Sequence, residues 1–424
     1  MSNKLNPSDK LTEIGKVPGE WQVVRLEQVI KEIKNGFASG KRDDNGIVQI
    51  RMNNVTTDGH LIFDSFLKVP APENINEFLL EENDLLFNNT NSIGLVGKST
   101  ISKDIPFPCT FSNHFTRIRF GGEVLPEWVL FHFIRLWKKG FFRSVAIRHV
   151  GQAAVQTKYL TSLKLPLPPL FEQKKIAEIL STVDQAIEKV GEAIEKTQKL
   201  KKGLMQELLT KGIGHKDFKD TEIGRIPKTW RVMELGETAN VRYGLGQPPA
   251  LETNGIPMIR ATNVKRGEIV REGLIFINRS AVPNSRDPFL REGDILVVRS
   301  GAYTGDVALV TKEWEGAVAG YDLIVTPSDT IDSKFLTYYL LSSPVQKRYF
   351  MGLKVRSAQP HLNSSQVEET PIPIVPLPEQ QKIAEILGTV DERLDMLKKR
   401  KGRLSKIKKG LMNDLLTGKV RVNA

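Results

Sequence analysis

The stretch that decides the fold begins at Leu165 as LPLPPLFEQKKIAEILSTVDQAIEK and closes on KLKKGLMQELLTK. The chain repeats it from Ile372 as IPIVPLPEQQKIAEILGTVDERLDM, closing on KIKKGLMNDLLTG. The displacement is 207 residues throughout, so Glu172 corresponds to Glu379 and Asp184 to Asp391. The sequence therefore predicts two copies of one structural unit.

Each copy carries the signals of a long helix. A proline-rich run comes first, and its prolines disfavour helix until the run ends. Glu172 and Glu379 then fall in the first turn, where the helix dipole favours an acidic side chain. A helix from Glu172 to Leu209 would be ~57 Å long at 1.5 Å per residue. That length exceeds what one compact domain needs.

Apolar residues follow at alternating steps of four and three. This spacing is the heptad seam of a coiled coil rather than the wider stripe of a helix on a globular core. The obvious partner for each seam is the other copy, although two unrelated helices that each cover a core remain the alternative. The seam consists of Ile176, Leu180, Val183, Ile187, Val190 and Ile194, and of Ile383, Leu387, Val390, Leu394 and Leu397.

Length and charge bound the function. A chain of 424 residues favours two or three domains. The formal net charge of +12 points to a polyanionic partner, with nucleic acid first. Residues 398–410 (KKRKGRLSKIKKG) contain eight basic residues and no acidic one. This run is either a solvated helix face or a phosphate contact.

Several classes of protein are disfavoured. The single cysteine, Cys109, allows no intramolecular disulfide and no cysteine cluster for zinc. The six histidines are scattered without metal-ligand spacing, so we expect no metal site. The N-terminus lacks a signal-peptide core, and no apolar run approaches the length of a membrane span. We expect a cytoplasmic protein.

The repeat extends beyond the helices. TEIGKVPGEWQVVRL (12–26) recurs as TEIGRIPKTWRVMEL (221–235), and NGIVQIRMNNV (45–55) recurs as NGIPMIRATNV (254–264). We interpret the tryptophan of each opening motif as packed under the start of its domain. Short β-rich runs bounded by Gly, Asn and Pro indicate strands. Each half is therefore expected to be a mixed α/β globule followed by a long helix.

The expected segments are a first globule (1–169), a helix (170–212), a second globule (213–376) and a helix with a basic end (377–424). Opening motifs and helices are nearly identical between the copies, whereas the globules keep a strand skeleton and change its polar residues. A structural duplication would keep core and surface alike. The pattern favours two recognition domains with different targets on one frame.

These motifs resemble a known family. The double LP-x-PL-x-EQ-x-K-IAEIL helix start, with two domains each opened by IG-x-(I/V)P-x-x-W-x-V, is similar to the specificity subunit of type I restriction-modification systems. The resemblance covers essentially the whole chain. It implies an α+β, mixed α/β fold with two tandem target-recognition domains and a pseudo-two-fold internal repeat. Each domain would recognise half of a split site in double-stranded DNA.

The resemblance also implies the arrangement and partners. The two helices would pair antiparallel as a coiled-coil spacer of fixed length, over base pairs that stay unspecified. Two modification subunits would bring S-adenosylmethionine and methylate adenine. Restriction subunits would bring ATP, Mg²⁺, translocation and cleavage. This chain itself would hold no cofactor.

Catalytic motifs are only approximated. GLVGKST (94–100) resembles the end of a phosphate loop, but Ser92 stands where its first glycine is required, so a strand-end turn is preferred. Glu172-Gln173-Lys174 has the spacing of a nuclease metal site, but it opens a helix and the second copy has no lysine there. The Asn/Asp-Pro-Pro-aromatic tetrad of an adenine methyltransferase is absent. We expect no turnover from this chain alone.

Polar residues at strand ends and in loops are the candidates for base contacts, because Asn and Gln suit adenine and Arg suits guanine. Some have structural alternatives. The Asn pairs could be turn formers, and the repeated arginines Arg51 and Arg260 could each belong to a structural ion pair with an acidic residue. The candidates are Arg51, Asn53, Asn54, Asn89, Asn91, Ser92, Asn113, His114, Arg148 and Gln152 in the first domain, and Arg260, Asn263, Lys265, Arg299, Ser300, Tyr303, Arg356, Gln359 and His361 in the second.

The helix starts are the candidates for partner binding, since two identical modification subunits need two equivalent surfaces. Their similarity could equally preserve packing within the chain. The other function considered is a duplicated coiled-coil scaffold that bridges two partner subunits and binds nucleic acid without specificity. The residues are Leu170, Glu172, Gln173, Ile176, Leu180, Leu377, Glu379, Gln380, Ile383 and Leu387.

Overall fold

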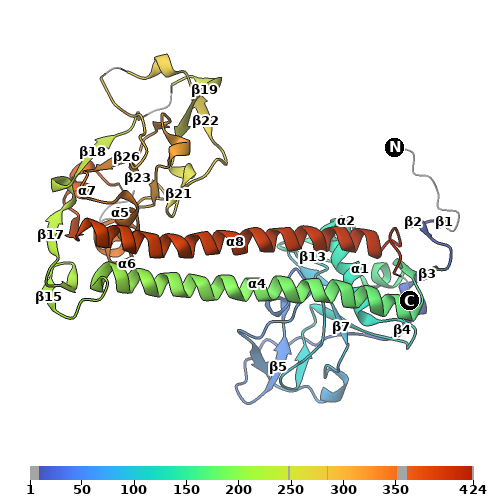
Figure 1. Cartoon of the computed structure of the whole chain (residues 1–424). Helices are drawn as coiled ribbons and strands as arrows, with labels where there is room; N and C mark the ends of the chain where they lie inside the picture. The colour runs from blue at the N-terminus through green and yellow to red at the C-terminus, as the bar shows by residue number, and fades with distance from the viewer. Residues whose placement is uncertain (1–8, 247–248, 284, 351–360, 423–424) are drawn as a thin grey trace. The chain divides into compact units, whose positions relative to one another are not determined.

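The chain divides into two units, each of which contains part of both long helices. The computed structural model describes residues 9–246, 249–283, 285–350 and 361–422. Unit 1 comprises residues 1–191 with 400–424, and unit 2 comprises residues 192–399. The two long helices, α4 (Leu170–Lys211) and α8 (Leu377–Leu415), each contribute residues to both units (Figure 1). Each unit therefore contains one globule and a segment of each long helix.

The globule of unit 1 is built from short strands and three short helices. Its strands are β1 (Asp9–Thr12), β2 (Gly15–Pro18), β3 (Gln22–Arg25), β4 (Ile30–Asn35), β5 (Ile47–Ile50), β6 (Leu67–Val69), β7 (Leu85–Asn88), β8 (Thr90–Asn91), β9 (Ser99–Ile101), β10 (Cys109–Phe111), β11 (Phe115–Phe120), β12 (Ile147–His149), β13 (Gln152–Ala154) and β14 (Lys164–Leu167). Its helices are α1 (Pro126–Lys138), α2 (Phe141–Val145) and α3 (Thr157–Thr161).

The globule of unit 2 follows the same plan. Its strands are β15 (Phe218–Thr221), β16 (Gly224–Pro227), β17 (Arg231–Glu234), β18 (Ala239–Tyr243), β19 (Leu251–Ile259), β20 (Val264–Lys265), β21 (Glu268–Ile269), β22 (Ile275–Ile277), β23 (Ile295–Val297), β24 (Val307–Leu309), β25 (Val318–Ala319), β26 (Leu323–Pro327) and β27 (Pro371–Ile374). Its short helices are α5 (Ser333–Leu340), α6 (Ser343–Val345) and α7 (Ser364–Glu368).

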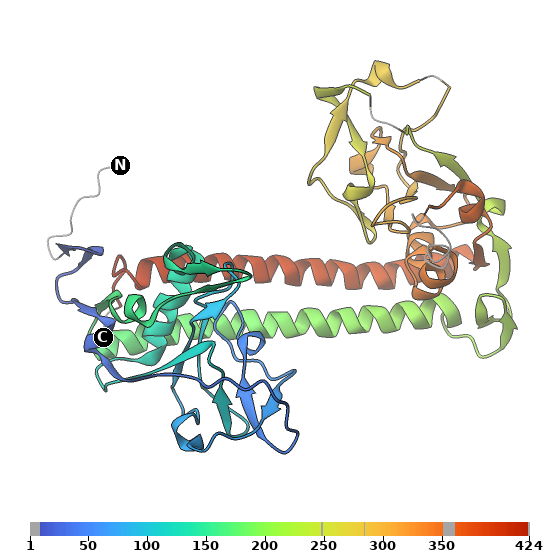
Figure 2. The same cartoon turned by 180° about the vertical axis from the view of Figure 1, so that it is seen from behind.

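Sheet topology confirms the duplication. An antiparallel sheet has the order β4-β11-β7-β9 in unit 1 and β18-β26-β23-β24 in unit 2. A smaller sheet, β10-β5-β6, corresponds to β25-β19-β22, and each contains one parallel and one antiparallel pairing. In Figures 1 and 2 the blue strands of the smaller sheet lie on the side of the first globule away from α4. The mixed α/β prediction is correct.

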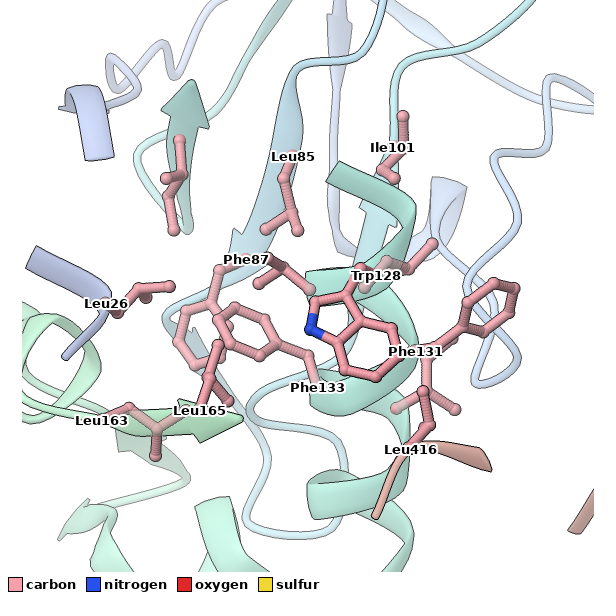
Figure 3. Close-up of a cluster of buried hydrophobic side chains, with 14 of the residues drawn as sticks. Leu26, Leu85, Phe87, Ile101, Trp128, Phe131, Phe133, Leu163, Leu165 and Leu416 are labelled. Carbon is pink, nitrogen blue, oxygen red and sulfur yellow. The ribbon is translucent and has the colours of Figure 1, made fainter. Parts of the chain in front are cut away.

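The core of unit 1 joins the globule to both long helices. Trp128 on α1 lies with Phe87, Phe133 and Leu165, and Leu416, just after α8, completes the cluster (Figure 3). All five side chains are buried. Ile176 and Leu180 of α4 belong to the same cluster. The N-terminal globule therefore depends on the last residues of the chain for a closed core.

The core of unit 2 has the same construction. Trp230 and Phe335 pack with Ile383 of α8 and with Leu208 and Leu209 of α4. Their counterparts in the repeat all belong to the first core: Trp21, Trp128, Ile176, Leu415 and Leu416. Each globule thus buries the start of the helix that follows it and the end of the other long helix.

The opening motif meets the helix start in both units. Trp21 donates from Nε1 to Glu172 Oε2 at 2.9 Å, and Trp230 donates to Glu379 Oε2 at 3.2 Å. Both indoles are fully buried. Arg421, beyond α8, also binds Glu172 at 2.7 Å. The interpretation of the tryptophans as packing residues at each domain start is confirmed, and they also fix the helix-opening glutamates.

Within each unit the two helix segments lie side by side. In unit 1 Lys408 of α8 pairs with Asp184 of α4 at 2.5 Å. In unit 2 Lys201 of α4 pairs with Asp391 of α8 at 2.6 Å. The seam residues are buried or half-buried throughout. Since Leu416 lies near the start of α4 while Lys408 lies farther along it, the segments of unit 1 run antiparallel.

Candidate nucleic-acid interface

Two repeated asparagines prove to be structural. Asn54 is 2% exposed; its Nδ2 donates to Ile62 O at 3.0 Å and Ser65 O at 2.7 Å, and its Oδ1 accepts from Arg51 N at 3.0 Å. Asn263 is fully buried with the matching set of bonds. Their polar atoms are satisfied inside the globule, as buried polar groups require. This corrects the prediction that these two contact DNA.

The paired arginines brace the same turns. Arg51 donates from Nη2 to Ser39 O at 2.9 Å, and Arg260 donates to Gly273 O at 2.6 Å. Within the described ranges neither side chain pairs with a carboxylate, so the ion-pair alternative is not what holds them. Both remain half-buried. Asn53, between the two structural residues of the first turn, is exposed.

Six of the first-domain candidates gather in one place, which we name the first polar cluster: Asn89, Asn91, Asn113, His114, Arg148 and Gln152. β8 pairs with β13 and β13 with β12, so Arg148 and Asn91 both lie opposite Ala153. Asn89 Nδ2 donates to Asn113 O at 3.3 Å and to Thr116 Oγ1 at 3.0 Å. The sheet therefore brings together residues that are far apart in the sequence.

The members of the first polar cluster differ in what they can offer a ligand. Asn91 is buried and donates to Asn88 Oδ1 at 2.6 Å, so its role is structural, which corrects its assignment as a DNA contact. Asn113, Arg148 and Gln152 are exposed, as is the neighbouring Ser92. Asn89 and His114 are half-buried. The exposed side chains offer amide and guanidinium donors.

In unit 2 the candidates meet two tyrosines, and we name the group the Arg299 cluster: Arg299, Tyr243, Tyr321, Asp322 and His361. The Arg299 guanidinium carbon lies 4.7 Å from the Tyr243 ring centre and 4.5 Å from that of Tyr321. A guanidinium this close to aromatic faces is held by cation–π attraction. Both tyrosines are partly exposed, at 39% and 47%.

A buried carboxylate and an exposed histidine complete the Arg299 cluster. Asp322 is 2% exposed, and its Oδ1 accepts from Arg299 N at 3.2 Å. Burial raises the pKa of Asp322 to about 6, although the bond and charge of Arg299 oppose the shift. Desolvation and the Arg299 charge lower the pKa of His361. His361 is therefore neutral at pH 7, and its Nε2 can accept from Arg299 Nη2.

Sequence reasoning missed Tyr243, Tyr321 and Asp322. Tyr243 ends β18, and Tyr321 and Asp322 directly precede β26. β18 and β26 are sheet neighbours, and so are β26 and β23, the strand that leads to Arg299. Their positions at strand ends could have identified them, because the same criterion identified Arg299 as a candidate.

The remaining second-domain candidates are dispersed. Ser300 forms a β-bridge with His361 and is half-buried, and Tyr303 is 44% exposed on the same loop. Lys265 is exposed and lies 3.6 Å from Glu272. Arg356 and Gln359 lie outside the described residues.

The partner-binding candidates on the helices are mostly internal. The Gln173 side chain bonds backbone groups on both sides: Leu125 N and Glu123 O just before α1, and Pro168 O just before α4. Gln380 makes the matching three bonds in unit 2. This corrects their assignment as an accessible partner surface. Seven of the ten are 0% exposed: Glu172, Gln173, Ile176, Leu180, Gln380, Ile383 and Leu387. Leu170, Leu377 and Glu379 are half-buried.

The other motifs singled out in the sequence have structural roles or no counterpart among the described residues. Lys98 is buried and donates to Met52 O at 3.0 Å and Val55 O at 2.6 Å, so it braces a turn rather than facing a phosphate. Among the described residues, no group of three or more His, Cys, Asp or Glu side chains could hold a metal ion. No helix in the described ranges is both long and apolar enough to cross a membrane.

Comparison with known proteins gives a consistent result. The chain matches the family described as type I restriction modification DNA specificity domain twice, over residues 18–197 and 227–406. It is 32% identical over 425 residues to a Methanocaldococcus jannaschii protein described as the MjaX type I restriction enzyme specificity subunit, covering 97% of this chain and 96% of that one. It is 30% identical over 420 residues to the MjaVIII specificity subunit of the same organism, covering 96% and 94%.

A solved structure shares the fold. The crystal structure of the type I restriction-modification S subunit from M. genitalium matches with a TM-score of 0.56 at 16% identity. The match covers 97% of this chain and 99% of that one.

Proposed function

We propose, from the premise that this chain belongs to the type I restriction-modification DNA specificity family, that its two globules recognise the two halves of one split DNA site. As a specificity subunit with two target-recognition domains, it selects the sequence on which its complex acts. The exposed members of the first polar cluster, Asn113, Arg148 and Gln152, and the Arg299 cluster are the residues we assign to base contacts.

One observation carries the proposal: matching backbone positions hold different polar side chains. Val155 N donates to Asn89 O at 2.8 Å, and Leu362 N donates to Arg299 O at 2.8 Å, so Asn89 and Arg299 occupy equivalent places. Asn35 and Tyr243 likewise end the matching strands β4 and β18. The Asn89 amide bonds within its own globule, whereas Arg299 can offer donors, so the repeated frame presents different groups in the two domains and is suited to two different base sequences.

The catalytic work is assigned to other subunits. Modification subunits would hold S-adenosylmethionine and methylate adenine, and restriction subunits would hold ATP and Mg²⁺ and cleave DNA. The absence of the methyltransferase tetrad from the sequence supports this division. We assign no turnover to this chain and place the complex in the cytoplasm, where its DNA lies.

The long helices are assigned to spacing and docking. Since seven helix-start residues are internal, docking falls to their exposed neighbours, such as Phe171, Lys174 and Lys175 on α4 and Gln381 and Lys382 on α8. The lysines and arginines of residues 398–409 are exposed except Lys408, which suits contact with phosphates and not with base edges. Base pairs contacted in that way stay unspecified.

The test is a genome-wide map of methylated adenine in cells with and without this gene. We expect a split motif, two short specified parts around a fixed unspecified gap, that disappears on deletion and returns on complementation. A split motif that persists after deletion would contradict the assignment. It would favour the alternative of a scaffold that bridges partners without sequence specificity.

A further inference from the structure

We propose that Arg299 recognises a guanine, so that the half-site read by the second domain contains a guanine at a fixed position. This inference rests on the proposed function and adds the identity of one base and of the residue that selects it. It concerns one side chain of the Arg299 cluster.

The Arg299 guanidinium forms no ion pair among the described residues. Some arginines of unit 2 pair with carboxylates, such as Arg242 with Asp294 at 2.8 Å and Arg291 with Asp287 at 2.5 Å, whereas Arg260 bonds a backbone carbonyl. The Arg299 guanidinium has no carboxylate within ion-pair distance among the described residues. A full charge held by tyrosine rings and a neutral histidine remains available to a ligand that carries acceptors.

The guanidinium is also fixed in place. Contacts with the Tyr243 and Tyr321 rings restrict its rotation. Tyr243 is itself anchored, because its hydroxyl accepts from Ser364 N at 3.0 Å. The Arg299 backbone is also held, because Arg299 N donates to Asp322 Oδ1 at 3.2 Å. A preorganised arginine loses less conformational freedom on binding than a free one, which favours a directed contact over a diffuse phosphate contact.

The free hydrogen-bond donors have the geometry that guanine requires. Nε is buried, and Nη2 uses one hydrogen on His361 Nε2. Nη1 makes no hydrogen bond within the part of the chain that the structure describes. Nη1 and the second hydrogen of Nη2 remain as adjacent donors, and a guanidinium presents adjacent donors as a planar fork that suits the O6 and N7 acceptors of guanine in the major groove. Thymine and cytosine do not offer that pair of acceptors.

The first domain shows the contrast. At the equivalent position Asn89 bonds inward to Asn113 O and Thr116 Oγ1, and its Oδ1 accepts from Thr90 Oγ1. The Asn89 amide thus makes its hydrogen bonds within the globule, whereas the Arg299 guanidinium keeps hydrogen-bond donors free. The same frame position is therefore structural in one domain and available in the other.

The experiment measures binding of the complex of this chain with its modification subunits to duplexes carrying its mapped site. Each guanine of the second half-site is replaced in turn by 7-deazaguanine, which lacks the N7 acceptor, or by inosine, which keeps N7 and O6. We expect one position where 7-deazaguanine weakens binding roughly 10-fold or more while inosine does not. Arg299→Ala should weaken binding to the unmodified site roughly 10- to 100-fold and abolish the 7-deazaguanine effect.

Two variants sharpen the result. Arg299→Lys keeps the charge but loses the fork, so it should behave as Arg299→Ala does. Arg231→Ala removes an equal charge from an exposed arginine outside the cluster and should leave the base preference unchanged. Circular dichroism of each variant confirms that the globule is folded.

Three outcomes overturn the inference. The second half-site could contain no guanine, Arg299→Lys could retain the full preference, or Arg299→Ala could weaken all sequences equally, which would indicate a phosphate contact. In each case the wild-type complex still prefers its split site, so the proposed function stands. A wild-type complex without any site preference would instead remove the proposed function.

Discussion

At the scale of single residues, Asp322 shows a conflict between stability and the recognition surface. Its pKa is raised by burial to about 6 from 3.8, so the folded protein binds a proton on it more tightly than the unfolded chain does. Above pH 6 the buried charge therefore lowers the free energy of unfolding, and this penalty fades as pH falls from 6 toward 4. The Asp322 carboxylate therefore bonds Arg299 N at the expense of stability near neutral pH.

Asp322→Asn should therefore stabilise unit 2. The amide oxygen can still accept from Arg299 N, while the buried charge is gone. We expect the free energy of unfolding to rise by roughly 1–3 kcal/mol at pH 7.5, and by less at pH 5. Urea unfolding at the two pH values measures both. An equal gain at both pH values would show that ionisation of Asp322 is not the cause.

At the scale of elements, one ion pair in each unit joins the two long helices and lies against an aromatic ring of the globule. Lys408 pairs with Asp184 and lies 5.9 Å from the Phe131 ring centre. Lys201 pairs with Asp391 and lies 5.4 Å from the Tyr338 ring centre, where Tyr338 also donates to Asp391 at 2.8 Å. The side chains of the first pair are 4% and 13% exposed, against 21% and 33% for the second.

Lys408→Met should destabilise unit 1 by about 3–5 kcal/mol, because it leaves the Asp184 charge buried and unpaired. Lys201→Met is the matched control and should cost less, since Asp391 keeps the Tyr338 bond and partial solvation. The double variant Asp184→Leu with Lys408→Met should recover most of the loss. Urea unfolding measures all three. Equal costs for the two single variants would contradict the role of burial.

The elements also show what sequence can predict. The long helices, their seam and the packed tryptophans follow from local patterns that the chain repeats, and the structure confirms them. The buried state of Glu172 and Gln173 did not follow, because repetition alone cannot distinguish an accessible surface from internal packing. The Arg299 cluster was only half found, since Tyr243 and Tyr321 are joined by strand order and not by sequence proximity.

At the scale of the whole molecule, the helices are proposed to determine the gap in the recognised site. Inserting four residues into the 172–209 helix adds about 6 Å of helix at 1.5 Å per residue. We expect the unspecified gap of the methylated motif to lengthen or shift, while both specified halves stay the same. A methylation map of cells carrying the insertion gives the result, and an unchanged gap would remove the spacing role.

The central claim is that each domain recognises its half-site independently of the other. The most direct test replaces residues 221–378 with the matching segment of a relative that has a different site, and maps methylated adenine in cells that carry the chimaera with its modification subunits. The first half of the motif and the gap should stay as they were, and the second half should become that of the donor. A motif that is unchanged, or altered in both halves at once, would contradict the account.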